Sequence, residues 1–329
     1  MQRTAIVISR HGGPEVLQTR SEPLPPPREG QVLARVTHVA LNHLDTWVRR
    51  GVPGHDFHLP RVPGSDVAVE VEGRAWVLHP SWGCGSCDAC ARGQQDRCRS
   101  FRIRGESTDG GCSTHVHVDR AHLLPVPAHL TPAQAVALPL TLLTAWHMLV
   151  GRAGLRRGER VLVQAGASGV GVMAIQIARL FGCEVHATAS TPERRERIAA
   201  LGATAWPYEA IGARNVDVVV ESVGTDTWDA SLRALAWGGR LVTCGATSGA
   251  RVGLDLRAVF FKQLSVLGST MGSTGELLDA WREVGAGRIV PVVDRVLPMS
   301  RIAEGHALLE SRAVFGKIVL EQDLGGGAA

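Results

Sequence analysis

The sequence predicts an α/β protein in which a doubly wound parallel sheet is joined to a smaller, β-rich barrel. Three observations support this class. The first third of the chain has short runs in which apolar and polar side chains alternate, as in half-buried strands. From about residue 160, short apolar strands alternate with helices, as in a parallel sheet covered on both faces. Four cysteines lie close together within the first region.

The bulk composition is that of a globular protein. The 329 residues are 45% hydrophobic and 20% charged, which suits about two domains. We find no run of eighteen apolar residues, so no membrane span is expected. The first residues do not form a signal peptide, so we expect a cytoplasmic location with reduced thiols. The net charge of +4 comes from arginines interleaved with acids, which argues against a nucleic-acid partner.

The barrel is expected to comprise residues 1–127. Residues 31–36 and 66–71 have the alternation of its strands, and residues 23–27 contain the prolines of an extended surface connector. The cysteine lobe is predicted as an insertion at residues 83–99. The tail, residues 289–329, is expected to return to this domain with a strand at residues 316–320.

The cysteines have the spacing C-x2-C-x2-C-x7-C. They are Cys84, Cys87, Cys90 and Cys98. Four thiolates at this spacing suit a tetrahedral zinc ion, and adjacent glycines let the backbone curl around it. Disulfides, an iron–sulfur cluster and four unrelated thiols are the alternatives. A site closed by four cysteines leaves no position for substrate, so we predict a structural Zn²⁺.

Residues 128–288 are expected to form the parallel-sheet domain. It begins near Thr131-Pro132, where proline occupies the first turn of a helix. Strands are predicted at residues 161–163, 184–188, 216–220, 240–243 and 265–267. Helices are predicted at residues 170–181 and 192–201. The repeated strand–helix order predicts a Rossmann-type dinucleotide-binding domain.

A glycine-rich loop follows the first of these strands and opens a helix. Its predicted cofactor-binding residues are Gly166, Ser168, Gly169, Val170 and Gly171. We expect Gly166 to permit a tight turn, Gly169 to admit the pyrophosphate and Gly171 to let helix and strand pack closely. The helix N-terminus supplies free N–H groups for the anion. A simple tight turn is the alternative reading of these glycines.

The end of the second strand indicates which nicotinamide cofactor is bound. NAD-binding folds usually place an acid there for the ribose diol. Here Ala189 or Ser190 stands at that place, and Arg194 follows within about one helical turn. A hydroxyl and a guanidinium suit a 2′-phosphate, so NADP(H) is predicted. The alternative is that Arg194 is an exposed helix residue paired with a glutamate.

A barrel with a cysteine lobe, followed by a Rossmann domain, resembles the medium-chain dehydrogenase/reductase superfamily. The motifs that carry the resemblance are Leu41-Asn42-His43-Leu44-Asp45, the four cysteines, Leu143-Thr144-Ala145-Trp146-His147, the glycine loop, Val223-Gly224, Leu267-Gly268-Ser269-Thr270 and Phe315-Gly316-Lys317. The resemblance implies a GroES-like barrel, a nicotinamide cofactor, a small-molecule substrate and a homodimer or homotetramer.

Alcohol dehydrogenases of this superfamily carry a second, catalytic zinc, and this sequence departs from each of its ligand positions. Asn42 stands where a cysteine is usual, and Ser65-Asp66 stands where His-Glu is usual. Residues 140–142 offer neither a cysteine nor a carboxylate. Asparagine, serine and leucine are poor zinc ligands, so no catalytic zinc is expected. The alternative is an unusual site recruited from His43, Asp66 or His147.

The pattern resembles the quinone reductase and zinc-free enoyl reductase branches of the superfamily. The predicted catalytic residues are Asn42, Asp45 and Thr144. Asp45 is expected to hold local structure or the cofactor-side network rather than to abstract a proton. Asn42 is the first choice to donate a hydrogen bond to the enolate oxygen, with a turn role as the alternative. Thr144 would contact the nicotinamide or only pack its helix. His147 could relay a proton, although such a histidine is more often an ordinary helix residue.

The resemblance also implies further cofactor contacts. These are Tyr208, near the adenosine phosphate, and Val223, Gly245, Ala246, Ser269, Thr270 and Lys317. The resulting prediction is an NADPH-dependent reductase of quinones or activated double bonds with one structural zinc. The alternatives are a zinc alcohol dehydrogenase with atypical ligands and a non-catalytic NADP-binding redox sensor.

Overall fold

The computed structural model describes residues 1–212 and 214–325. It divides into two compact units, Met1–Leu140 with Pro291–Ala329 as unit 1 and Thr141–Val290 as unit 2. The first crossing between them follows Leu140, later than the expected residue 127. The reason is that helix α3 (Pro132–Ala135) packs against three strands of unit 1.

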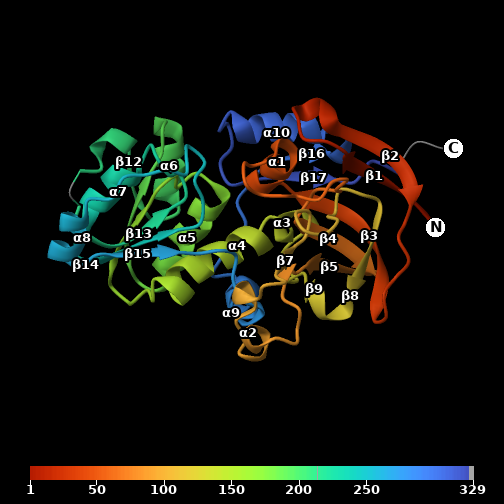
Figure 1. The fold of residues 1–329 in the computed structure, drawn as a ribbon, viewed down its shortest axis with the longest axis horizontal. Helices are drawn as coiled ribbons and strands as arrows, with labels where there is room; N and C mark the ends of the chain where they lie inside the picture. Colours follow the sequence, from red (N-terminus) through yellow and green to blue (C-terminus); the bar gives the residue numbers. More distant parts are fainter. Residues whose placement is uncertain (213, 326–329) are drawn as a thin grey trace. The chain divides into compact units, whose positions relative to one another are not determined.

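Unit 1 is built on a seven-stranded sheet. Its path is β16-β17-β3-β4-β5-β9, and β8 pairs with β3 beside that path. All these pairs are antiparallel except β16 with β17. The strands are β3 (Gln31–Ala40), β4 (Asp66–Val71), β5 (Arg74–Leu78), β8 (His115–Asp119), β9 (Leu123–Pro125), β16 (Val293–Pro298) and β17 (Lys317–Glu321). The last strand therefore pairs directly with β3, so segments from early and late in the sequence share one sheet (Figure 1).

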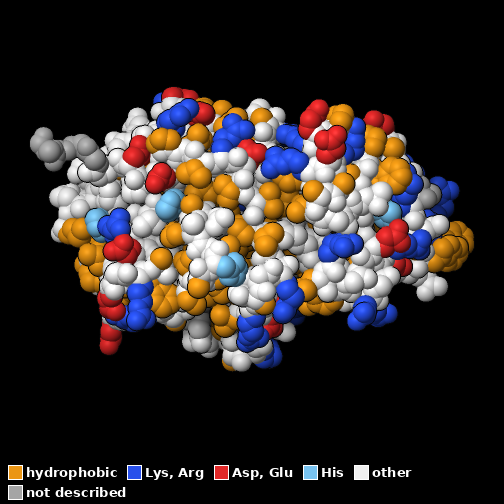
Figure 2. All heavy atoms as spheres, turned by 180° about the vertical axis from the view of Figure 1, so that it is seen from behind, with side chains coloured by type: hydrophobic (Ala, Val, Ile, Leu, Met, Phe, Trp, Pro, Cys, Tyr) orange, Lys and Arg blue, Asp and Glu red, His pale blue; other side chains and the backbone are white. Residues whose placement is uncertain are grey.

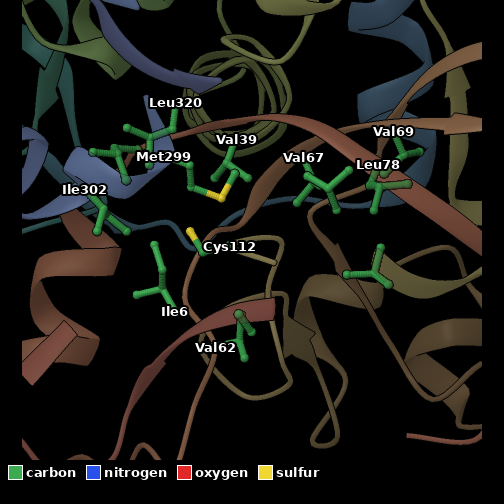
Figure 3. Close-up of a cluster of buried hydrophobic side chains, with 14 of the residues drawn as sticks. Ile6, Val39, Val62, Val67, Val69, Leu78, Cys112, Met299, Ile302 and Leu320 are labelled. Atoms are coloured by element: carbon green, nitrogen blue, oxygen red, sulfur yellow. The ribbon is translucent and has the colours of Figure 1, made fainter. Parts of the chain in front are cut away.

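Smaller elements complete unit 1. The strands β1 (Gln2–Ile8) and β2 (Leu17–Pro23) form a hairpin, and β6 (Ser81–Trp82) pairs with β7 (Arg102–Ile103) at the base of the cysteine lobe. The α-helices are α1 (His43–Arg50), α2 (Asp88–Ala91), α10 (Ile302–Glu310) and the short helix α3. Alternate side chains of the strands point into one apolar core, in which Ile6, Val39, Val67 and Leu320 lie together (Figure 3).

Unit 2 contains a six-stranded, wholly parallel sheet. Its order is β12-β11-β10-β13-β14-β15. The strands are β10 (Arg160–Val163), β11 (Glu184–Thr188), β12 (Thr204–Trp206), β13 (Val216–Glu221), β14 (Leu235–Thr243) and β15 (Ser265–Gly268). The order reverses between β10 and β13, so the chain leaves these neighbouring strands in opposite directions. Ligands of open α/β sheets bind at such a switch point, beyond the carboxyl ends of the strands.

Helices alternate with these strands. They are α4 (Pro139–Trp146), α5 (Gly169–Leu180), α6 (Pro192–Ala200), α7 (Trp228–Ala234), α8 (Leu256–Lys262) and α9 (Thr274–Gly285). A π-helical turn, His147–Arg152, directly follows α4. By length and composition the helical stretch Pro132–Arg152 could cross a membrane, although polar residues interrupt its apolar sequence. Its most apolar window is 83% buried inside the protein, as in a core helix.

Candidate functional site

The four predicted metal ligands converge at the tip of the cysteine lobe. The Sγ atoms of Cys84, Cys87, Cys90 and Cys98 all lie within 4.8 Å of one another. Tetrahedral zinc with Zn–S bonds of about 2.3 Å requires S–S separations of about 3.8 Å, so the donors fit the ion with a small contraction. A Cβ at Gly83 would lie 2.5 Å from the Cys90 Sγ, which explains the glycine.

Hydrogen bonding inside the lobe favours the thiolate form of Cys84, whereas burial disfavours that of Cys90. The backbone and hydroxyl of Ser86 lower the pKa of Cys84 to about 6. The backbone N–H of Cys84 in turn donates to the Cys98 Sγ at 3.3 Å. Burial raises the pKa of Cys90 to about 11. A bound cation would stabilise all four thiolates together, because metal binding requires deprotonated sulfur.

A second polar cluster lies inside unit 1, where β3, β4 and β17 meet. The Lys317 Nζ donates to the Asn42 Oδ1 at 2.5 Å and to the Asp66 Oδ2 at 3.1 Å. The Asn42 Nδ2 donates to the same Asp66 oxygen at 3.0 Å. The other Asp66 oxygen accepts from the backbone N–H of Leu140 at 2.7 Å. All three side chains are buried, so an ammonium and a carboxylate form an ion pair away from solvent.

This arrangement changes the expected role of Asn42. We predicted a free amide that donates to a substrate oxygen, but its Nδ2 is engaged by Asp66 and by the Ala40 carbonyl. Its Oδ1 is engaged by Lys317. An amide has only two N–H donors, so the direct donor role is not supported and Asn42 instead helps to hold the ion pair. Lys317 was predicted from sequence only as a cofactor contact, and that contact stays a prediction.

Asp45 has a local structural role. Its Oδ2 accepts from the backbone N–H of Asn42 at 2.8 Å, which forms a capping box at the start of α1. Its Oδ1 accepts from the backbone N–H of Gly64 at 2.9 Å. Burial raises the pKa of Asp45 to about 6, although these two hydrogen bonds act in the opposite direction. Both oxygens are thus engaged by backbone, and a catalytic role for Asp45 finds no support in this geometry.

The glycine loop lies between β10 and α5, as predicted. Ser168 caps α5, and its Oγ accepts from the backbone N–H of Gly171 at 3.0 Å. A Cβ at Gly171 would lie 2.4 Å from the Ala165 carbonyl oxygen, which confirms the expected close packing. The tight turn is not at Gly166, because the left-handed φ of +52° belongs to Ala165. Gly166 is required instead because a Cβ would lie 2.8 Å from that of Ala187.

The carboxyl end of β11 brings Ser190 and Arg194 together. The Arg194 Nη1 donates to the Ser190 Oγ at 3.1 Å, across the first turn of α6. No carboxylate follows the strand within residues 187–192. The backbone of Ala189 pairs with Trp206 at the end of β12, and Tyr208 lies two residues further on. The structure therefore places the predicted 2′-phosphate contacts at one edge of the sheet.

The loops that follow β13 and β14 are joined to each other by backbone hydrogen bonds. The Val223 carbonyl accepts from the N–H of Ser248 at 2.7 Å, and the Thr225 N–H donates to Gly249 at 3.2 Å. A Cβ at Gly245 would lie 3.2 Å from the Ser222 carbonyl oxygen, so this loop also lies close to the first. The predicted residues Val223, Gly245 and Ala246 thus belong to one compact structure. Ser269 and Thr270 follow at the end of the neighbouring strand β15.

Thr144 and His147 lie on consecutive turns of one helical stretch. The His147 Nδ1 lies 2.8 Å from the Glu276 Oε1, and the same carboxylate accepts from the backbone and hydroxyl of Ser273. Burial acts to raise the pKa of Glu276, but the hydrogen bonds from His147 and Ser273 lower it below its usual value. The Thr144 hydroxyl lies 3.9 Å from the Met271 Sδ. His147 thus has a fixed acidic partner that the sequence did not reveal.

Two acids were missed from the sequence, the buried Glu221 and the half-buried Glu276. Glu276 follows Ser273 by three residues, the spacing of a capping box, so that signal was available. Glu221 ends an apolar strand and is fully buried, which its neighbours in sequence do not reveal.

Comparison with known proteins now fixes the family. Residues 28–128 match the alcohol dehydrogenase GroES-like domain, and residues 169–286 match the zinc-binding dehydrogenase domain. The solved structure of an NAD-dependent alcohol dehydrogenase is 40% identical, with a TM-score of 0.92, over 97% of this chain and 99% of that one. The chain belongs to the medium-chain dehydrogenase/reductase superfamily. It is an oxidoreductase of that superfamily.

Members with different named activities are similar to this medium-chain dehydrogenase/reductase. Human quinone oxidoreductase is 28% identical, over 96% of this chain and 97% of its own length. A crotonyl-CoA carboxylase/reductase solved in complex with NADP is 25% identical, with a TM-score of 0.89, over 97% of this chain and 95% of that one. The superfamily is therefore fixed, whereas substrate and cofactor must be argued from the residues of this chain.

Proposed function

We propose that the chain is an NADPH-dependent reductase that passes hydride to a quinone or to the β-carbon of an activated alkene, with no catalytic metal. The observation that carries this proposal is the Lys317–Asn42–Asp66 cluster. Asn42 and Asp66 stand where the resemblance implies zinc ligands, yet both engage the Lys317 ammonium. A buried cation at 2.5–3.1 Å from these oxygens disfavours a divalent ion at the same place, because like charges repel.

NADP(H) as the cofactor is supported by the pairing of Arg194 with Ser190. A guanidinium and a hydroxyl 3.1 Å apart can share one phosphate, and residues 187–192 at the end of β11 include no acid that would repel it. Ser168 and the N-terminus of α5 would hold the pyrophosphate. When bound, NADPH would supply the hydride. The chain would orient the cofactor, and a proton from solvent would complete reduction of the alkene or quinone.

The cysteine lobe supports a structural Zn²⁺ as the second bound group. Four thiol sulfurs within 4.8 Å fill a tetrahedral coordination sphere and leave no position for substrate. The zinc would stabilise residues 83–99, whose only regular structure is the short helix α2 and a 3-10 turn at Gln95–Arg97. Its role would therefore be in folding, because such a site supplies no open ligand position for chemistry.

An alcohol dehydrogenase that uses NAD is the second candidate. It is favoured by the 40% identity to a structure described as an NAD-dependent alcohol dehydrogenase. Initial rates separate the two. We expect NADPH oxidation with a benzoquinone, a cyclic enone or crotonyl-CoA, and slower turnover with simple alcohols and NAD⁺. Faster alcohol oxidation with NAD⁺ would favour the second candidate, and tight NADPH binding without turnover across the panel would favour a redox sensor.

A homodimer through the β15 edge of unit 2 is the proposed assembly. Strand β15 ends the sheet, so its outer edge has unpaired backbone groups. Nearby, Leu256, Phe260 and Phe261 of α8 are 58–67% exposed. Hydrophobic side chains gather at the margin of the molecule that carries this helix (Figure 2). Exposed apolar patches of this kind mark interfaces.

Light scattering after size exclusion tests this assembly. We expect a dimer for the wild type and a monomer for Phe261→Glu, whereas Leu33→Glu, at an exposed apolar residue of β3 in unit 1, is a control. A tetramer that Phe261→Glu reduces to dimers would indicate a second interface, and an unchanged mass would exclude this one. A cytoplasmic location, with no nucleic-acid or membrane partner, also remains a prediction.

A further inference from the structure

A continuous chain of buried hydrogen bonds crosses the switch point of unit 2. The Ala165 backbone N–H donates to the Thr188 Oγ1 at 3.0 Å, and this hydroxyl donates to the Gln164 Oε1 at 2.8 Å. The Gln164 Nε2 donates to the Ser231 Oγ at 3.0 Å, and that hydroxyl donates to the Glu221 Oε2 at 2.6 Å. The four side chains are at most 1% exposed.

The direction of every donor in this chain is determined. The Glu221 carboxylate can only accept, so the Ser231 hydrogen goes to it and the Ser231 oxygen accepts from the Gln164 NH₂ group. The Gln164 carbonyl oxygen therefore faces Thr188, whose hydroxyl donates to it. All donors point towards one carboxylate, an arrangement in which successive hydrogen bonds polarise and strengthen one another.

The other side of the Glu221 carboxylate holds the turn after β13. Its Oε1 accepts from the backbone N–H of Val223 at 2.7 Å, from that of Gly224 at 3.1 Å and from the Thr227 hydroxyl at 3.0 Å. No lysine, arginine or histidine pairs with Glu221 among the residues that the structure describes. Its charge is thus balanced by donors alone, each of which is fixed in place.

This turn has little freedom to adopt another shape. Gly224 has a φ of +92°, and a Cβ there would lie 2.3 Å from the Gly249 carbonyl oxygen. Backbone hydrogen bonds of Val223 and Thr225 also join this turn to the loop at residues 244–249. Glu221 therefore holds this turn directly, and through the turn it holds the loop at residues 244–249. The hydrogen-bond chain links Glu221 to the glycine loop at Ala165.

We propose that Glu221 is a positioning residue for the dinucleotide. Through the buried chain, its carboxylate holds the glycine loop and the turn at residues 222–225 in the geometry that a cofactor spanning both requires. The inference rests on the proposed binding of NADPH at this switch point. It implies that loss of the carboxylate weakens ligands that reach both loops, and spares ligands that occupy only the Ser190–Arg194 end.

Titration of the full chain with two ligands tests the proposal. NADPH spans the switch point, whereas 2′,5′-ADP carries only the adenosine phosphates. We expect Glu221→Gln to weaken NADPH roughly ten- to hundredfold, the effect of one buried charge-assisted hydrogen-bonding group. The affinity for 2′,5′-ADP should change less than about twofold in the same variant. A merely structural role would weaken both ligands alike.

A second pair of variants keeps the test informative if Glu221→Gln folds poorly. Thr227→Val removes one donor to the carboxylate without changing the shape of the side chain, and Thr227→Ser restores the hydroxyl. We expect the same selective loss for valine, to a smaller extent, and its recovery for serine. Equal losses for both ligands, or unchanged NADPH affinity, would overturn the positioning role. A wild type that binds neither ligand would overturn the proposed function as well.

Discussion

Lys317 and Asp66 form an ion pair that is almost completely excluded from solvent, with the Nζ and Oδ2 atoms 3.1 Å apart. They are 251 residues apart in sequence and come from the neighbours of β3 in the same sheet. Asn42 completes the cluster through both ends of its amide. In a superfamily where this region can hold zinc, the chain thus carries its own fixed positive charge there.

Breaking this ion pair should destabilise the fold. Lys317→Met leaves the Asp66 carboxylate buried without its cation, which typically costs about 3–5 kcal/mol. The double variant Lys317→Met with Asp66→Asn removes both charges and should recover a large part of that loss. Urea unfolding of the wild type, both single variants and the double variant measures the coupling. Additive losses in this cycle would show that the two charges do not interact.

Asp45 should make the fold weaker as the pH rises from about 4 to about 6. Its folded pKa of about 6 lies above the value of 3.8 in an unfolded chain, so the native state binds more protons in this window. The shift of about two units corresponds to roughly 3 kcal/mol, present below pH 4 and lost above pH 6. The wild-type unfolding free energy minus that of Asp45→Asn should fall across this window. A difference that is flat or rises with pH contradicts the assignment.

Two substitutions in the glycine loop should differ in their effect on stability, in an order that the glycine motif does not suggest. Ala165→Gly should alter stability by less than about 1 kcal/mol, because relief of the left-handed φ is offset by greater freedom of the unfolded chain. Gly171→Ala should cost about 1–3 kcal/mol, because its Cβ would lie 2.4 Å from a carbonyl oxygen. Thermal unfolding of both variants checks this order, and the reverse order would refute the geometry.

Arg194 should set the preference for NADPH over NADH. Arg194→Ala removes one charge-assisted contact and should weaken NADPH by about 1–3 kcal/mol, with little effect on NADH. Arg197→Ala, on the same helix, is a control for the loss of one positive charge. Fluorescence titration with both cofactors gives the comparison. Equal weakening of NADH and NADPH would show that Arg194 does not contact a 2′-phosphate.

The cysteine lobe should depend on its metal. Cys87→Ser removes one of four sulfur ligands, and we expect loss of bound zinc together with lower thermal stability. Cys183→Ser is a matched control, because this thiol lies outside the cluster. Zinc content by mass spectrometry and a melting curve give both readouts. A variant that keeps its zinc, or loses zinc without losing stability, would argue against a structural ion.

The sequence was sufficient for features that depend on local pattern. The apolar core of β10, Val161–Val163, is short and unbroken, and the cysteine spacing defines a site without reference to the rest of the chain. The cluster of Lys317 with Asn42 could not be derived in this way, because 275 residues separate them and strand pairing alone brings them together. Glu221 was missed for a different reason, because it ends a strand rich in valine and its burial depends on the packing of α7 against β13. Its five hydrogen bonds all come from residues within ten positions in sequence.

Zinc content measured together with NADPH oxidation tests the absence of a catalytic metal most directly. We predict one zinc per chain, held by the cysteine lobe. We also predict that a quinone or enone is reduced at an unchanged rate after mild chelation that leaves this zinc in place. Two zincs per chain, with activity that disappears when the more labile one is removed, would contradict it.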